Sequence, residues 1–347
     1  MQLYLIGLNH KTAPIDIREK FYLTPLQQDL FLSELKNRVP FLQAFIISTC
    51  NRTEIYTYVL DDFSPFDSVL EIIARIKEVN QPENFRNYFY ILTEKNAVEH
   101  LLNVVCGLDS LVLGEKQILG QIKNAVDRGR KLDMFQKELN LLTAVTIRAG
   151  KKAQTETQIS FGGSSISWAA MTKAEHMLGT LEGKSILIIG AGKMSELAVG
   201  QIQNKNFSNL YVMNRTPCNA EFLAEKYGGT AVGFCDLKEK LIEVDICICC
   251  AGAPHYVLEK IDIEKIMSER SAHELILIDI SMPRNIDPSV KNIPDVHLFE
   301  IDDLNEVVDS NMKTRESAIS DVKTIIQDKL NEFYQKLKPL SHEPAVS

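Results

Sequence analysis

Residues 185–195 read SILIIGAGKMS, and this stretch decides the fold of the C-terminal half. A short apolar run passes directly into a Gly-Ala-Gly turn, which is typical of a strand that turns tightly into a helix. Such a turn lets a pyrophosphate approach the backbone at the positive end of the helix. A tight turn without a ligand is the alternative. The stretch predicts cofactor-binding residues at Gly190, Ala191, Gly192, Lys193, Met194 and Ser195, with Ser195 in the place of the usual third glycine.

The segments around this turn predict a doubly wound α/β domain of Rossmann-like type. Leu210–Met213, Val244–Cys249 and Leu275–Ile278 are short, almost continuous apolar runs, as expected for parallel strands that are covered on both faces. Helical stretches follow the first three strands of the series.

The end of the second strand indicates which dinucleotide is bound. An NAD-specific site would place Asp or Glu about 20 residues after the glycine turn. The chain instead has Asn214, Arg215 and Thr216. A guanidinium and a hydroxyl can bind a 2′-phosphate, whereas a carboxylate would repel it. We therefore predict NADPH as the cofactor; a solvated surface cation is the alternative interpretation of Arg215.

The N-terminal part predicts a ferredoxin-like βαββαβ domain. Thr24 precedes Pro25 as a helix N-cap, and the later strands are rich in β-branched and aromatic residues. The expected elements are strand Leu3–Leu8, helix Pro25–Arg38, strands Ala44–Ser48 and Glu54–Val59, helix Pro65–Glu78 and strand Tyr88–Leu92.

Helices are expected in two further regions. Residues 94–182 are almost wholly helical in pattern, with a break at residues 162–165. Within them, Lys116–Lys152 holds nine basic residues against three acidic ones, although the whole chain has a net charge of −8. Ile301–Lys338 predicts one long helix with apolar residues on more than one face, so part of that surface should point outward.

Composition excludes several classes of protein. The chain has 347 residues, 45% hydrophobic and 24% charged, which fits two or three folded domains. No apolar run approaches the roughly 18 residues of a membrane span, and the start lacks a secretory signal, so we expect a cytoplasmic protein. The seven cysteines should be free thiols. Cys247, Cys249 and Cys250 lack metal-ligand spacing, so no metal site is expected.

Cys50 is the candidate nucleophile. It lies in the polar loop Ser48–Arg52 between two predicted strands, beside a cation and hydroxyls that could activate a thiol. A buried filler is the competing interpretation. His100 on its helix is by itself more typical of a filler, whereas the glycine-bounded segment Gly107–Gln117 carries polar groups suited to a small ligand.

Taken together, these segments resemble the glutamyl-tRNA reductase family over nearly the whole chain. The resemblance rests on 7–14 (GLNHKTAP), 48–54 (STCNRTE), 107–121, 190–194 (GAGKM), 214–216 (NRT) and 279–288 (DISMPRNIDP). The loop and the N-terminal motif are highly specific together, whereas the glycine turn alone is weak.

The resemblance implies a mechanism and a substrate. Cys50 would attack the ester that joins glutamate to the tRNA 3′ end, and NADPH would reduce the resulting thioester to glutamate 1-semialdehyde for tetrapyrrole synthesis. His100 would be important for activity, and Arg52 would pair with the substrate carboxylate. The implied glutamate pocket consists of Thr49, Asn51, Arg52, Ser110, Glu115, Lys116, Gln117 and Gln121.

The resemblance also implies domains and partners. Residues 1–156 would form the catalytic, glutamyl-tRNA-binding domain and 157–300 the NADP-binding domain. Residues 301–347 would form a linking helix and the start of a dimerisation domain that this chain mostly lacks, so that the family's homodimer would be weak or absent. Glutamate-1-semialdehyde aminomutase is a candidate partner. Lys116 departs from the Pro that is usual there.

Two interpretations from other classes remain open. An NADP-dependent small-molecule dehydrogenase related to shikimate dehydrogenase would share the second domain without needing the Cys50 loop. A non-catalytic tRNA-binding or NADPH-sensing protein would tolerate the loss of Cys50.

Overall fold

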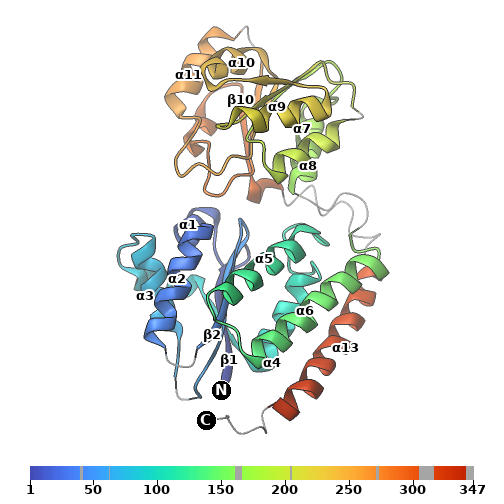
Figure 1. Cartoon of the computed structure of the whole chain (residues 1–347). Coiled ribbons are helices and arrows are strands. Elements are labelled where there is room, and N and C mark those ends of the chain that lie inside the picture. The colour runs from blue at the N-terminus through green and yellow to red at the C-terminus, as the bar shows by residue number, and fades with distance from the viewer. Residues whose placement is uncertain are drawn as a thin grey trace. The chain divides into compact units, whose positions relative to one another are not determined.

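The computed structural model describes residues 1–39, 42–61, 63–160, 166–203, 205–270, 273–304 and 316–340. The chain divides into two compact units (Figure 1). Unit 1 is Met1–Ser164 together with Asn311–Ser347, and unit 2 is Ser165–Ser310.

Unit 1 is built on a four-stranded antiparallel sheet in the order β2-β3-β1-β4. This order confirms the ferredoxin-like prediction. Its strands are β1 (Gln2–Asn9), β2 (Gln43–Ser48), β3 (Arg52–Val59) and β4 (Tyr90–Thr93). Its helices are α1 (Ile15–Phe21), α2 (Pro25–Arg38), α3 (Phe66–Ile76), α4 (Glu94–Val105), α5 (Gln117–Lys131), α6 (Lys137–Glu156) and α13 (Glu316–Leu340), with the 3-10 helix η1 (Pro82–Tyr88).

Helices cover both faces of the sheet at β2 and β3, where side chains alternate between the two faces and are almost all buried. In β2, Ala44 and Ile46 pack with α1, α2 and α3, whereas Phe45 and Ile47 pack with α4, α5, α6 and α13. Figure 1 shows the two helical layers on opposite sides of the sheet.

Helix α13 differs from the single long helix expected from Ile301. Ile301–Leu304 form the short 3-10 helix η4 in unit 2, and residues 305–315, with Val307 and Val308, lie outside the described residues. The apolar side of α13 packs against α4 and α6. The expectation of an outward apolar surface is not met where the structure describes this helix, since Val322, Ile326, Leu330 and Phe333 are buried within unit 1.

Unit 2 is a six-stranded parallel sheet in the order β10-β9-β8-β5-β6-β7. Its strands are β5 (Ser185–Ile189), β6 (Asn209–Met213), β7 (Thr230–Val232), β8 (Ile246–Cys249), β9 (Leu275–Asp279) and β10 (Val296–Glu300). The helices are α7 (Ile166–Leu178), α8 (Lys193–Ile202), α9 (Pro217–Tyr227), α10 (Leu237–Glu243) and α11 (Lys260–Glu269), with the 3-10 helices η2 (Phe234–Asp236) and η3 (Pro288–Asn292).

The strand order confirms the doubly wound prediction. The chain proceeds from β5 to β7 in one direction and then returns to β8 on the other side of β5. Ligands of such sheets bind outside the carboxyl ends of the strands where the order reverses. The turn at Gly190 lies at this point. None of the helices that the structure describes is long and apolar enough to cross a membrane.

Candidate functional site

The loop between β2 and β3 carries Cys50. The backbone N–H of Thr49 donates to the carbonyl of Arg52 at 2.8 Å, which closes the loop between the two strands. Nε of Arg18, a buried residue of α1, donates to the carbonyl of Cys50 at 3.2 Å. Hydrogen bonds within the β2–β3 hairpin and from helix α1 therefore hold the loop in place.

A small cavity of about 10 Å³ gathers most of the predicted catalytic and glutamate-binding residues. It is lined by Thr49, Cys50, Asn51, Arg52, Ser110, Glu115, Ile118 and Gln121. This volume is close to that of a single water probe. A glutamyl group can enter only if side chains around Cys50 move.

Two of the predicted pocket residues do not line this cavity. Lys116 is exposed just before α5, and its carbonyl accepts a hydrogen bond from Nε2 of Gln154 at 3.2 Å. Gln117 is half-buried, and its Nε2 has no hydrogen-bond partner among the described residues. The structure therefore places neither side chain at the thiol.

The surroundings of Cys50 favour the neutral thiol in this structure. Burial, with a smaller contribution from Glu115, raises the pKa of Cys50 to about 12, although Arg18 and Arg52 act to lower it. The expected activation by a neighbouring cation is therefore outweighed. Burial also raises the pKa of Glu115 to about 7, against a lowering effect of Arg52. A proton acceptor that titrates near neutral pH thus lines the same cavity as the thiol.

The guanidinium of Arg52 is already paired within the protein. Nη1 lies 2.6 Å from Oε1 of Glu54 and 3.0 Å from Oδ2 of Asp109, and Nη2 donates to the Asp109 carbonyl. Asp109 also forms an ion pair with Lys11. Burial alone would lower the pKa of Arg52, but Glu54 and Asp109 hold it above its ordinary value. The predicted bidentate contact with a substrate carboxylate would therefore require these pairs to rearrange.

Glu54 joins Arg52 to His100. The carboxylate is fully buried, and it accepts from the Tyr90 hydroxyl at 2.6 Å and from the Tyr56 hydroxyl at 2.7 Å. Nε2 of His100 lies 3.0 Å from Glu54 Oε1. Burial would raise the pKa of Glu54, but Arg52 and His100 hold it below its usual range.

The sequence interpretation did not include Glu54 and Asp109 among the site residues. One signal for Glu54 was present: a carboxylate that alternates with Tyr56 and Tyr58 on one face of a strand rich in aromatic residues needs a buried partner. His100 contacts this network through Glu54 but does not line the Cys50 cavity, so its importance for activity stays a prediction.

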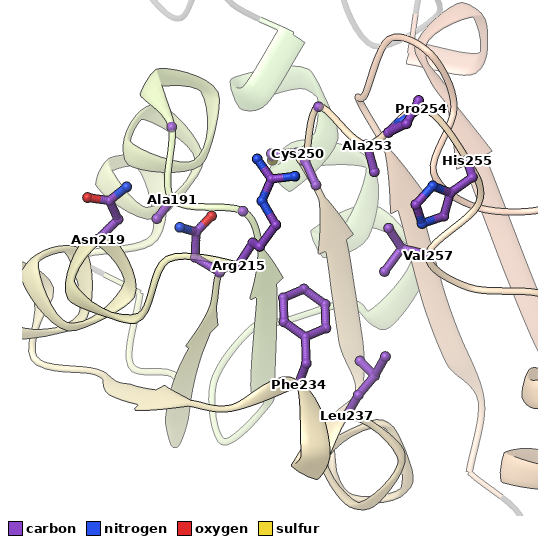
Figure 2. A pocket seen from close by; sticks show the side chains of 15 residues that line it. Ala191, Arg215, Asn219, Phe234, Leu237, Cys250, Ala253, Pro254, His255 and Val257 are labelled. Carbon is purple, nitrogen blue, oxygen red and sulfur yellow. The ribbon is translucent and has the colours of Figure 1, made fainter.

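A second, larger pocket of about 670 Å³ lies at the carboxyl ends of the unit 2 strands. Its volume is within the range of small-molecule and cofactor sites. Its lining includes the predicted Gly190, Ala191, Gly192, Asn214 and Arg215, together with Asn219, Phe234, Leu237, Cys250, Ala251, Gly252, Ala253, Pro254, His255 and Val257. Figure 2 shows Asn219 toward one end of this pocket and Ala253, Pro254 and His255 toward the other.

The glycine turn fits a dinucleotide. Gly190 has φ +110°, and a Cβ there would lie 2.8 Å from the carbonyl oxygen of Cys250, so only glycine is accommodated. A Cβ on Gly192 would meet nothing within 4 Å, which leaves open space at the start of α8. Arg215 is exposed and has no ion-pair or hydrogen-bond partner within the described part of the chain. These features leave room for a pyrophosphate and an available cation for a 2′-phosphate.

Four predicted cofactor residues do not line the pocket. Lys193 pairs with Glu196 at 2.7 Å, and the carbonyl of Met194 accepts from a serine hydroxyl on α7 at 3.0 Å. Ser195 is fully buried, and the carbonyl of Thr216 accepts from an asparagine side chain at 2.9 Å. Thr216 is exposed beside Arg215, and the contact of its hydroxyl with a 2′-phosphate stays a prediction.

The sequence interpretation missed the loop after β8, although ligands of such sheets are expected at the carboxyl ends of the strands. This loop, residues 250–257, supplies much of the pocket wall. Cys247 and Cys249 are buried in β8, whereas Cys250 is half-buried and lines the pocket. The described residues contain no group of three His, Cys, Asp or Glu side chains that could hold a metal ion.

Comparison with known protein families separates the same two regions. Residues 6–157 match the family described as glutamyl-tRNAGlu reductase, N-terminal domain. Residues 172–307 match the family described as shikimate / quinate 5-dehydrogenase. The second match covers one part of the chain only, so a free dehydrogenase of that type is not favoured.

Relatives extend the likeness over both regions. Glutamyl-tRNA reductase of Heliobacterium mobile is 37% identical over 346 residues, which cover 100% of this chain and 78% of that protein. The enzyme of Thermodesulfovibrio yellowstonii is 38% identical over 352 residues, covering 100% of this chain and 82% of that protein. The solved structure of glutamyl-tRNA reductase from Methanopyrus kandleri aligns with a TM-score of 0.54 and 30% identity, over 97% of this chain and 81% of that one. This chain, with the loop that carries Cys50 and the glycine turn at Gly190, belongs to the glutamyl-tRNA reductase family.

Proposed function

We propose that this chain reduces the glutamyl group of glutamyl-tRNA(Glu) to glutamate 1-semialdehyde, with NADPH as reductant and a thioester on Cys50 as intermediate. The single observation that carries the proposal is the cavity that brings Cys50 together with Arg52, Ser110, Glu115 and Gln121. We assign catalysis to residues 1–156 and cofactor binding to residues 157–300. Residues 301–347 would connect to the family's dimerisation domain.

The first step is acyl transfer to the thiol. The Cys50 sulfur forms a bond to the glutamyl carbonyl carbon, the bond from that carbon to the ribose oxygen breaks, and the tRNA leaves with a proton on that oxygen. The thiol must lose its own proton, which its buried surroundings oppose. Glu115 is the acidic residue in the cavity lining, and we assign it as the acceptor of that proton.

The second step converts the thioester to the aldehyde. Bound NADPH would supply the hydride that reduces the thioester carbon, after which the carbon–sulfur bond breaks. Cys50 is then regenerated. The choice of NADPH over NADH rests on Arg215, which is exposed at the pocket without a protein partner among the described residues.

Within the proposal, Glu54 positions the side chains of His100 and Arg52. Glu54 hydrogen-bonds both side chains without itself lining the cavity. Arg52 lines the cavity, so a shift of its guanidinium from Asp109 toward the substrate would present a cation to the glutamate carboxylate.

Substitution of Cys50 tests the proposal. Cys50→Ser should abolish semialdehyde formation from glutamyl-tRNA and NADPH while NADPH binding persists, because a serine hydroxyl is a much weaker nucleophile. Cys218→Ser, at an exposed thiol of unit 2, is the matched control and should keep full activity. Residual activity of Cys50→Ser above a few per cent of wild type would overturn the thioester route.

Two associations are part of the proposal. The semialdehyde is reactive, so glutamate-1-semialdehyde aminomutase is the partner expected to receive it. We also expect a monomer or a weak dimer at micromolar concentration, because α13 buries its described apolar residues against α4 and α6 of its own unit. Light scattering would contradict this expectation if a dimer survived dilution to nanomolar concentration.

A further inference from the structure

The segment 279–288 (DISMPRNIDP) makes a hydrogen-bonded turn at the carboxyl end of β9. Asp279 is buried, and its Oδ1 accepts from the backbone N–H of Ser281 at 2.9 Å. Its Oδ2 accepts from the backbone N–H groups of Asn285 at 2.7 Å and Ile286 at 2.8 Å. One carboxylate thus closes the segment on itself and sets the orientation of Asn285.

Asn285 connects this turn to the loop after β8. The side chain is fully buried, and Nδ2 donates to the carbonyls of Ala253 at 3.0 Å and His255 at 3.1 Å. The backbone carbonyl of Asn285 accepts from the N–H groups of Val257 at 2.6 Å and Leu258 at 3.0 Å. A single residue therefore makes four hydrogen bonds to residues 253–258.

The loop that Asn285 holds is part of the wall of the dinucleotide pocket. Ala253, His255 and Val257 all line that pocket, whereas Asn285 and Asp279 do not (Figure 2). The loop has no strand or helix of its own between Cys249 and Lys260. Its shape therefore depends on bonds from elsewhere in unit 2, and Asn285 supplies four of them.

We propose that Asn285, oriented by Asp279, is a positioning residue that preorganises the 253–257 wall of the cofactor pocket. The identification of the ligand as NADPH rests on the proposed function; the clamp itself rests on the hydrogen bonds. A wall that is already ordered lowers the entropy lost when a ligand binds, so the clamp should act on cofactor affinity.

Asn285→Asp is the sharpest variant. It keeps the shape of the side chain but places a carboxylate oxygen against two carbonyl oxygens, so both side-chain bonds are lost. Asn285→Ser removes the amide without adding charge and serves as the second variant. Asn209→Asp is the matched control, since Asn209 is exposed in the same unit and its Nδ2 makes one bond, to Ser185 at 3.0 Å.

Two measurements on the full chain separate positioning from a general structural role. Fluorescence titration should show that the Kd for NADPH rises about 10-fold in both Asn285 variants and stays within about twofold in Asn209→Asp. Hydrogen exchange should speed up at the amides of Val257 and Leu258, while the amides of β5 keep their protection.

The outcomes are distinct. An unchanged NADPH Kd in both Asn285 variants would overturn the inference, and so would exchange that accelerates equally throughout unit 2, because both results indicate that the bonds only hold the domain together. Failure of the wild-type chain to bind NADPH would instead overturn the proposed cofactor. If Asn285→Asp does not fold, the Kd and the exchange pattern of Asn285→Ser decide between the same two results.

Discussion

The two pockets differ in whether their charged side chains are paired within the protein. The cavity at Cys50 is small, about 10 Å³, and the guanidinium of Arg52 in its wall is paired with Glu54 and Asp109. The dinucleotide pocket is much larger, about 670 Å³, and Arg215 has no partner within the described residues. Burying ions is costly unless they are paired. At the Cys50 cavity the buried guanidinium is therefore paired within the folded chain, whereas at the dinucleotide pocket Arg215 stays available for a ligand.

This difference indicates which substitutions will affect stability and which will affect binding. Residues of the Arg52 network are buried and mutually dependent, so changes there should destabilise unit 1. Residues around Arg215 are exposed, so changes there should alter cofactor affinity with little effect on folding.

The largest expected effect is that of Glu54→Gln. Removing the carboxylate charge leaves Arg52 with only Asp109 as a counter-ion in a buried site, which should lower the free energy of unfolding by about 3 kcal/mol. The matched control is Glu71→Gln, at an exposed pair in which Arg38 Nη1 and Glu71 Oε2 are 3.2 Å apart; that change should cost less than about 1 kcal/mol. Urea denaturation measures the loss of unfolding free energy in both variants. Equal losses in Glu54→Gln and Glu71→Gln would contradict the distinction between the buried, paired charges and the exposed ones.

The next effect concerns the available cation. Arg215→Asp replaces an attraction to a 2′-phosphate with a repulsion, so NADPH binding should weaken by about 2–3 kcal/mol while NADH binding changes much less. Titration with both cofactors measures the preference. Lys265→Asp, at an exposed position of α11, should leave it unaltered. A preference for NADPH that persists in Arg215→Asp would show that this cation does not contact the cofactor.

The smallest effect is the pH dependence contributed by Glu115. Its pKa in the folded chain is raised by burial to about 7, above the ordinary value of a glutamate. The folded state then holds the proton more tightly than the unfolded state, so this group's contribution to stability is present at low pH and is lost as pH rises toward about 7. Between pH 5 and pH 7.5, the decrease in the free energy of unfolding should be smaller in Glu115→Gln than in wild type by on the order of 1–2 kcal/mol. An identical pH profile in the variant would mean that the carboxyl group is solvated.

Local signals predicted much of the fold. Helix α2 has the predicted bounds because Pro25 follows the N-cap Thr24, which forms a capping box with Gln27: Thr24 Oγ1 accepts from Gln27 N, and Gln27 Oε1 accepts from Thr24 N. Strand β5 has the predicted bounds because its apolar run ends at a glycine. Strand β7 was missed because it has only three residues, and none of them is fully buried.

The candidate site was only partly predictable. Cys50 and Arg52 are adjacent to a strand end and could be singled out in the sequence. The partners of Glu54 could not be singled out in this way. Tyr90 and His100 are 36 and 46 residues away along the chain, and no local pattern connects them to Glu54. Likewise Asn285 reaches across more than 30 residues to Ala253, so its role appears only when β8 and β9 are placed side by side.

Covalent trapping on Cys50 tests the thioester most directly. The chain would be incubated with radiolabelled glutamyl-tRNA in the absence of NADPH, quenched in acid and separated on a denaturing gel. We predict a base-labile label on the wild-type chain and on Cys218→Ser, and no label on Cys50→Ser. Equal labelling of Cys50→Ser and wild type would contradict the proposal that Cys50 carries the glutamyl group.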